Sequence, residues 1–195
     1  IVTRVDAMET NLIQAESPVL EPLQAFYAEA GRALPAIEAI DSDATPEPYR
    51  TLLVHHRDMT SALEAFHSQP IALQPRVMHR RDDLLSREVL LVGERDGRPV
   101  EYGAITIELS AFPEAAQAEV IEAKRPLGAI LHDYGIAHRS EPSAFLRVVP
   151  DEHMRTVLHM NGCDRLYGRC NVLRRDDHAV LARVVEILPP TERTS

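Results

Sequence analysis

The sequence predicts an α+β fold, in which a single antiparallel β-sheet of about six strands carries helices packed on one side. Two patterns support this prediction. Apolar residues recur at three- and four-residue steps mainly in the first third of the chain, whereas beyond Ile71 they alternate or form short blocks separated by turn residues. The 195 residues, 45% of them hydrophobic and 26% charged, suffice for one globular domain with its own core.

The helices are expected near the N-terminus and in one later stretch. Residues 18–31 show the apolar spacing of one helix face, and residues 41–48 are polar and proline-rich, as is typical of a loop. Asp58 can cap a helix over Met59–His67, because its carboxylate can accept the free amides of the first turn. The alanine- and glutamate-rich residues 113–123 predict another helix.

The strands begin at Ile71, where the apolar pattern changes to alternation. Pro75 interrupts the first strand and so assigns it to a sheet edge or a bulge. The apolar runs 86–93 and 99–109 flank an Asp-Gly pair, which is typical of a β-hairpin. Three further strands are predicted at residues 144–149, 166–174 and 179–188.

The same patterns divide the chain into three parts. We expect an N-terminal extension with an amphipathic helix at 1–45, the main domain at 46–190 and a tail at 191–195, all within one globular unit.

Charge and composition limit the partners. The formal net charge of −9 opposes binding to a nucleic-acid backbone, so a small molecule is the expected partner. No apolar run approaches the roughly 20 residues of a membrane helix. We therefore expect no nucleic acid, no membrane and a cytoplasmic location. Cys163 and Cys170 lack the spacing of a metal site and are expected to be reduced thiols.

Arg87 is the first candidate functional residue, because it interrupts an apolar strand and its guanidinium keeps its charge when buried. A structural role remains open at this point. Arg87 can lie on the solvent face of a half-exposed strand, or pair with Glu88 or Glu101.

Glu186 raises the same question, because its neighbours in the last strand are all apolar. This almost wholly apolar strand belongs in the middle of the sheet or against a helix layer. A carboxylate desolvated there is suited to proton transfer. The alternative is an outward-facing glutamate on an edge strand.

Metal and nucleophile chemistry find no support. The nine histidines include the adjacent His55 and His56, but no pair has the spacing of metal ligands on a helix. The Gly-x-Ser-x-Gly pattern of serine hydrolases does not occur. We expect neither a metal nor another cofactor.

A series of short motifs resembles the chorismate lyase family (chorismate pyruvate-lyase, 4-hydroxybenzoate synthase) of ubiquinone biosynthesis, over roughly residues 52–190. The motifs occur in the order found in that family. They are Asp58-Met59-Thr60, Arg-Glu-Val-Leu-Leu at 87–91, Gly97-Arg98-Pro99 with Gly103 beyond it, Pro-Leu-Gly at 126–128, Tyr167-Gly168-Arg169, and Glu-Ile-Leu-Pro at 186–189.

The resemblance implies a chorismate lyase-like fold and a monomeric, cofactor-independent enzyme that eliminates pyruvate from chorismate to give 4-hydroxybenzoate. Arg87 would bind the ring carboxylate and Glu186 would assist proton transfer at the far end of the ring, so these two residues are the implied catalytic pair. The implied substrate-binding residues are Met59, Arg87, Gly103, Leu127 and Glu186.

One departure from the family leaves a question open. Ala104 follows Gly103 where the family often places an arginine. The partner of the enolpyruvyl carboxylate is therefore undecided among Arg76, His79, Arg139 and Arg169.

Two other functions remain open. The fold also serves as the ligand-sensing, UTRA-like domain of certain bacterial transcription regulators, which would make this chain a non-catalytic binder of an aromatic acid. A related enzyme acting on another chorismate-derived aromatic carboxylate is the second alternative.

Overall fold

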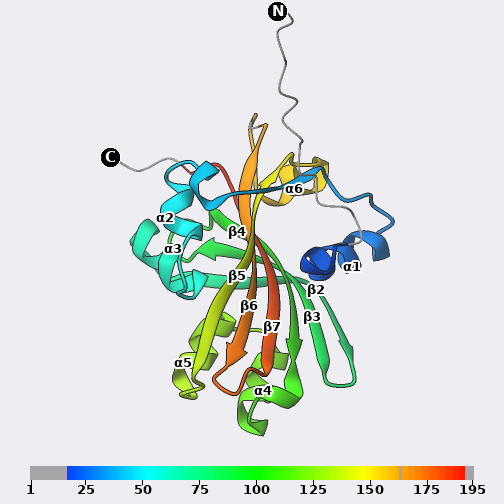
Figure 1. Ribbon diagram of the computed structural model, residues 1–195, viewed down its shortest axis with the longest axis vertical. Helices are drawn as coiled ribbons and strands as arrows, with labels where there is room; N and C mark the ends of the chain where they lie inside the picture. The colour runs from blue at the N-terminus through cyan, green and yellow to red at the C-terminus, as the bar shows by residue number, and fades with distance from the viewer. Residues whose placement is uncertain (1–16, 163, 192–195) are drawn as a thin grey trace, which may run out of the picture.

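The computed structural model describes residues 17–162 and 164–191, which form a curved seven-stranded antiparallel sheet with helices around it (Figure 1). The strand order is β1-β5-β6-β7-β4-β3-β2. The strands are β1 (Ile37–Ile40), β2 (Ile71–Arg81), β3 (Leu84–Gly93), β4 (Pro99–Glu108), β5 (His138–Val148), β6 (Leu166–Arg175) and β7 (Val180–Leu188).

The α-helices are short, none of the described ones exceeding nine residues. They are α1 (Glu21–Glu29), α2 (Tyr49–Leu53), α3 (Met59–His67), α4 (Glu114–Glu122), α5 (Leu127–Asp133) and α6 (Glu152–Val157), with 3-10 turns at Pro18–Leu20, Ser42–Ala44 and Leu109–Ala111. The predicted cap of α3 is present, because the Asp58 carboxylate accepts a hydrogen bond from the Ser61 amide at 2.8 Å.

The predicted turn between β3 and β4 and the predicted interruption of β2 at Pro75 are both present and follow from local chemistry. Gly97 adopts φ 65° in the turn between β3 and β4, and the Asp96 carboxylate accepts the Arg98 amide there at 3.0 Å. β2 is an edge strand, and its pairing with β3 shifts register between Pro75 and Val77. Proline donates no ladder hydrogen bond, so this position at an edge is the one that it tolerates.

The central strands of the sheet are buried on both faces, whereas most of the edge strand β2 is exposed. Side chains alternate across each strand, so that Leu90 and Ile187 pack on one face with α1 and α6, while Leu91 and Leu188 pack on the other with α2 and α3. Helices α4 and α5 cover the remaining part of this second face, around Ile107. The predicted α+β class and antiparallel sheet are confirmed.

The structure differs from the prediction in two details of the sheet. It has seven strands rather than about six, because β1 pairs with β5 at the edge opposite β2, and it carries helices on both faces rather than one. The physical reason is length: β1 has four residues, α2 five and α6 six, which is too short for a period to be recognised in the sequence.

Residues 17–45 pack onto the same sheet as the rest of the chain. Leu23 and Phe26 of α1 lie in the core, and Ile37 of β1 pairs with Val148. The expected division of the chain near residue 45 stays a prediction, as does the expected monomer. Residues 1–16 and 192–195, parts of the expected extension and tail, lie outside the described residues.

A buried polar cluster ties α6 to the sheet face opposite the site described below. The Glu88 carboxylate accepts a hydrogen bond from the Tyr102 hydroxyl at 2.6 Å, lies 2.9 Å from His153 Nε2 on α6 and 4.0 Å from the Arg32 guanidinium. Glu88 thus has partners of its own and does not pair with Arg87.

Two expectations drawn from composition concern single features. Cys170 is a free thiol inside the core, and its burial raises its pKa to about 12, whereas Cys163 lies outside the described residues. None of the helices in the described part of the chain is both long and apolar enough to cross a bilayer.

Candidate ligand-binding site

A pocket lies between the second sheet face and the N-terminal ends of α3 and α5. Strands β2, β3, β4, β6 and β7 form its floor. Most of its lining is apolar: Met59, Leu73, Val89, Leu91, Ile105, Pro126, Leu127, Leu131, Leu173 and Val184. The polar side chains in the lining are Asp58, Thr60, Arg87, Glu101, His138, Asn171 and Glu186, and Gly128 completes it.

Arg87 enters this pocket from β3 and is 1% exposed. One of its terminal nitrogens donates a hydrogen bond to the Val120 carbonyl of α4 at 3.3 Å, and its buried Nε has no partner among the described residues. Burial lowers the pKa of Arg87 to about 10, so the guanidinium still carries its charge at neutral pH. Within the described chain, no carboxylate forms an ion pair with it.

Glu186 enters the pocket from β7, between β4 and β6. It is buried and bonded to Arg169, whose Nε donates to its carboxylate from the facing position on β6. β7 is a central strand and Glu186 is buried, so the alternative of an outward-facing glutamate on an edge strand is ruled out.

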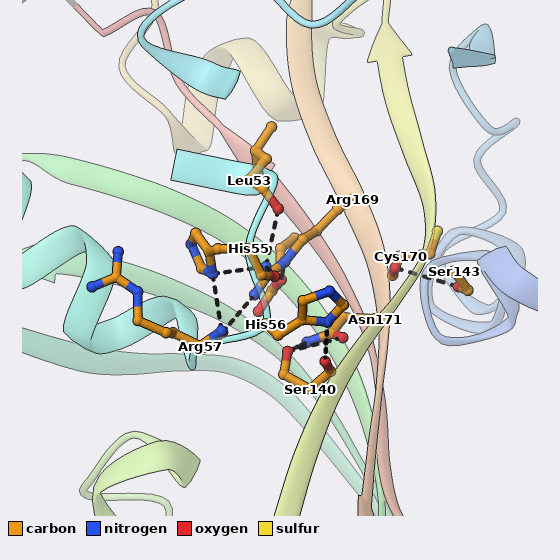
Figure 2. A network of polar contacts seen from close by, with 10 residues as sticks. Leu53, His55, His56, Arg57, Ser140, Ser143, Arg169, Cys170 and Asn171 are labelled. Atoms are coloured by element: carbon orange, nitrogen blue, oxygen red, sulfur yellow. Dashed lines mark hydrogen bonds and ion pairs between the residues drawn. The ribbon is translucent and has the colours of Figure 1, made fainter. Parts of the chain in front are cut away.

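Arg169 is fully buried behind the pocket wall and also holds the loop between α2 and α3 (Figure 2). One of its terminal nitrogens donates to the carbonyls of Leu53 and His55, both at 3.1 Å, and the other donates to the Arg57 carbonyl at 3.4 Å. Burial and then the charge of Arg169 lower the pKa of the His55 imidazole. The loop that leads to Asp58 and Met59 is therefore tied to the pocket through Arg169.

Glu101 is a second carboxyl group in the pocket wall, on β4. It is 4% exposed, and its buried Oε2 has no hydrogen-bond partner within residues 17–162 and 164–191. Burial, and after it the negative charge of Glu186, raises the pKa of Glu101 well above its ordinary value, while Arg169 acts in the opposite direction.

Gly103 provides the space that the Glu101 side chain uses. A Cβ placed on Gly103 would lie 3.1 Å from Glu101 Oε1 and 3.1 Å from Val89 Cγ2. Gly103 pairs with Glu186 across β4 and β7, so it lies beneath both carboxyl groups. Its contribution is room in the pocket floor; its implied role in substrate binding stays a prediction.

The mouth of the pocket lies where α3 and α5 meet. Met59 is the first residue of α3 and Leu127 the first of α5, and both line the pocket. A Cβ on Gly128 would lie 3.1 Å from the Asp58 carboxylate, so the glycine lets the two helix ends approach closely. Asn171 of β6 also lines the pocket, and its side-chain amide donates a hydrogen bond to the Ser140 hydroxyl at 2.8 Å (Figure 2).

The structure brings most of the predicted site residues into this one pocket. Met59, Arg87, Leu127 and Glu186 line it, and Gly103 lies in its floor. Of the four candidates for a second anion contact, Arg76 is exposed on β2, His79 pairs with Glu29 at 2.9 Å, and Arg139 lies 3.6 Å from Asp176 at the surface. Arg169 is near the pocket, but its charge is paired with Glu186.

Sequence reasoning missed Glu101 as part of the site. The signal was present, because Glu101, Gly103 and Ile105 alternate on β4 and must share one face. The pairing of Arg169 with Glu186 was missed as well. It depends on the register of β6 against β7, which no local pattern in either strand specifies.

Comparison with known proteins supports the fold. No protein-family model and no curated protein sequence matches this chain. PhnF from Mycobacterium smegmatis shares the fold with a TM-score of 0.54 and 16% identity, over 71% of this chain and 65% of PhnF, so this chain spans less than two thirds of that protein. The effector domain of PhnF, solved separately, gives the same TM-score and identity over 68% of this chain and 88% of the domain. Gene product SA0254 from Staphylococcus aureus gives 0.52 and 6%, over 72% and 98%.

These comparisons correct the functional prediction. Structures such as the PhnF effector domain belong to the UTRA effector domains of the GntR family, which have a chorismate lyase-like fold. The prediction of an enzyme, and in particular of a chorismate pyruvate-lyase, is therefore wrong: the structural neighbours are regulator effector domains. Lyase chemistry on chorismate, with 4-hydroxybenzoate and pyruvate as products, and a place in ubiquinone biosynthesis have no support. The chain is similar in fold to the effector domain of PhnF.

Proposed function

We propose that this chain is a non-catalytic, UTRA-like ligand-sensing domain that binds a small cyclic or aromatic carboxylate in the pocket between the sheet and helices α3 and α5. Arg87 binds the carboxylate, and the apolar residues of the wall enclose the ring. The single observation that carries the proposal is the Arg87 guanidinium, which is buried in the pocket wall and paired with no carboxylate of the described chain.

The energetics of Arg87 favour an anionic ligand. Taking a charged group out of water costs several kcal/mol, and one carbonyl at 3.3 Å offsets little of that. A carboxylate can accept two parallel hydrogen bonds from a guanidinium, which is the geometry that arginine is best suited to provide. A bound anion would therefore accept the unused hydrogen bonds of the Arg87 guanidinium, and these hydrogen bonds would contribute to its binding free energy.

The shape and composition of the wall favour a compact ring. Leu91, Ile105, Leu127 and Leu173 offer apolar surface on several sides of the pocket, and its few polar groups are placed at separate positions. This combination is typical of sites for small organic ligands, in which polar groups fix the orientation.

The arrangement of Glu186 supports binding rather than proton transfer. Its carboxylate is bonded to Arg169, which in turn holds three carbonyls of the loop from Leu53 to Arg57. The charge-assisted hydrogen bond from the buried Arg169 guanidinium therefore holds the Glu186 carboxylate in place. The same contacts couple the pocket to the loop that leads into α3, which is a connection that a sensing domain needs.

The test is isothermal titration of the protein with benzoate, comparing wild type with Arg87→Met. We expect the variant to bind at least about tenfold more weakly, since a charged hydrogen bond in a buried site contributes about 1.5–3 kcal/mol. The matched control is Arg76→Met, which removes an exposed arginine from the neighbouring strand β2 and should leave the affinity unchanged. Equal affinity of wild type and Arg87→Met would refute the proposal.

A further inference from the structure

The pocket contains a second polar end, built from two carboxyl groups and one guanidinium, whose ligand preference can be inferred if the proposed function holds. Along β4, Ile105 pairs with Arg87 of β3, Gly103 pairs with Glu186 of β7, and Glu101 comes two residues further. Each two-residue step along a strand is about 7 Å. Glu101 and Glu186 therefore face the part of a ligand that lies away from Arg87.

The positive charge at this end is fully used. Arg169 gives its Nε to Glu186 and its terminal nitrogens to backbone carbonyls of the loop between α2 and α3. Glu101 is left with no cation bonded to it among the described residues. Its Oε1 lies over Gly103, and its buried Oε2 has no partner.

An ionised Glu101 would be a buried, unpaired charge beside a second carboxylate, an arrangement that costs several kcal/mol. Carrying a proton removes that cost, and burial with the charge of Glu186 favours this form. A protonated carboxyl group is a hydrogen-bond donor. The charged or titratable groups that line or adjoin the pocket around it are Asp58, His55, Arg87, His138, Arg169 and Glu186.

We propose that Glu101 is a specificity-determining residue that donates a hydrogen bond, as a neutral carboxylic acid, to the end of the ligand remote from Arg87, while Glu186 accepts one there. The site then selects a monoanion: a ring with one carboxylate for Arg87 and, at its other end, a neutral group that can accept from Glu101 and donate to Glu186. A second carboxylate at that end meets the negative charge of Glu186 and has no free cation to bind.

A matched pair of ligands tests this selection. Terephthalate and 4-carbamoylbenzoate have the same ring and nearly the same shape, and they differ in whether the group opposite the first carboxylate is a second carboxylate or a neutral amide. In titration calorimetry we expect the wild type to bind 4-carbamoylbenzoate at least about tenfold more tightly, as juxtaposed like charges cost several kcal/mol. Equal or tighter binding of terephthalate would overturn the proposal.

The pH dependence of the same binding tests the role of Glu101 itself. Affinity of the wild type for 4-carbamoylbenzoate should fall as the pH is raised and Glu101 loses its proton. Glu101→Gln keeps a neutral donor of the same shape, so its affinity should stay high and no longer depend on pH. Glu94→Gln, which removes an exposed carboxylate that does not line this pocket, should behave as wild type. A Glu101→Gln variant with the wild-type pH profile would overturn the proposal.

One measurement needs no ligand and separates the two proposals. Infrared difference spectra near neutral pH should show the C=O stretch of a protonated carboxylic acid in the wild type and not in Glu101→Gln. If that band is missing in the wild type, Glu101 is ionised and this inference fails, even where benzoate binds through Arg87. If the band is present but no carboxylate binds in an Arg87-dependent way, the proposed function fails and the donor at Glu101 must serve a ligand of another class, which overturns the monoanion selection.

Discussion

Arg169 and Glu186 face each other in register on the adjacent strands β6 and β7, and the Arg169 Nε donates a hydrogen bond to the Glu186 carboxylate. Both side chains are buried, at 0% and 7% exposed. Arg169 also holds the backbone of residues Leu53, His55 and Arg57. The pair therefore stabilises the sheet and fixes the loop before α3 at the same time.

The first prediction is that Glu186→Gln destabilises the protein. The apolar neighbours of Glu186 alone would suggest a gain, because an amide costs less to bury than a carboxylate. Arg169 reverses that expectation, since losing one partner of a buried ion pair leaves the other charge uncompensated and typically costs about 3–5 kcal/mol. Urea unfolding of the wild type and the variant measures the difference.

A second ion pair provides the control for this prediction. Arg174 and Glu141 form a hydrogen-bonded pair at 3.1 Å between β6 and β5, but both are substantially exposed, at 32% and 48%. Glu141→Gln should change the free energy of unfolding by less than about 1 kcal/mol. A similar loss of unfolding free energy in both variants would show that the burial of the Arg169–Glu186 pair does not increase the cost of removing one partner.

The second prediction concerns Arg87 in the ligand-free protein. Its buried charge has only the Val120 carbonyl at 3.3 Å to offset the loss of hydration. Replacing it by an apolar side chain of similar length removes that cost, so Arg87→Met should unfold at the same or a higher temperature than the wild type. Thermal melting without ligand checks this. A variant that melts well below the wild type would make Arg87 a structural residue rather than one kept for ligand binding.

How much of the site the sequence predicts depends on the kind of pattern that each residue leaves. The helix that begins at Met59 follows from the Asp58 cap, which is a local signal, whereas the place of Met59 in the site was implied by the family resemblance. Glu186 stands out because an acidic residue in an apolar strand is rare. Arg169 leaves no such trace, because its role arises from the pairing of β6 with β7 and from a loop more than 100 residues away, and Glu186 is recognised as its partner only in three dimensions.

The same reasoning explains what the sequence predicts of the fold. Apolar runs on either side of a turn predict the long strands β3 and β4. In contrast, β1 has only four residues, and its place at the sheet edge depends on its pairing with β5. Its residues carry too little periodicity to indicate a strand. Function is harder to predict than the fold, because one fold can occur in both enzymes and binding domains. Only the groups in the pocket distinguish the two.

The third prediction concerns Gly168, which precedes Arg169 on β6. A Cβ at this position would lie 2.3 Å from the Glu186 backbone oxygen and 3.2 Å from the Ile187 Cα. Backbone atoms of a central strand cannot move aside as a flexible side chain can, so Gly168→Ala should destabilise the protein by about 1–3 kcal/mol or more. Urea unfolding measures this loss of stability. Gly135→Ala is unsuitable as a control, because Gly135 has φ 59° and alanine would be strained there whatever the space around it.

A better comparison for Gly168 is Gly103→Ala on the neighbouring part of the sheet. There the added Cβ meets the Glu101 and Val89 side chains at 3.1 Å, and side chains can shift by a few tenths of an ångström. Its loss of stability should be smaller than that of Gly168→Ala. The opposite order would show that the close approach of β6 to β7 is not what requires a glycine at 168.

The last prediction is that the stability of Glu101→Gln relative to the wild type depends on pH. Burial and the charge of Glu186 raise the pKa of Glu101 in the folded protein above its ordinary value of 4.5. The stabilisation that belongs to the protonated form is therefore fully present below about pH 4.5 and is lost as the pH rises towards the folded pKa. Across that interval the wild type should lose up to about 1.4 kcal/mol per pH unit relative to the variant, whose amide does not titrate. Urea unfolding at several values from about pH 5 to about pH 8 measures the difference. Glu94→Gln, with an exposed carboxylate removed, should follow the wild-type curve, and a Glu101→Gln curve parallel to both would mean that Glu101 is ionised in the folded protein as it is in the unfolded chain.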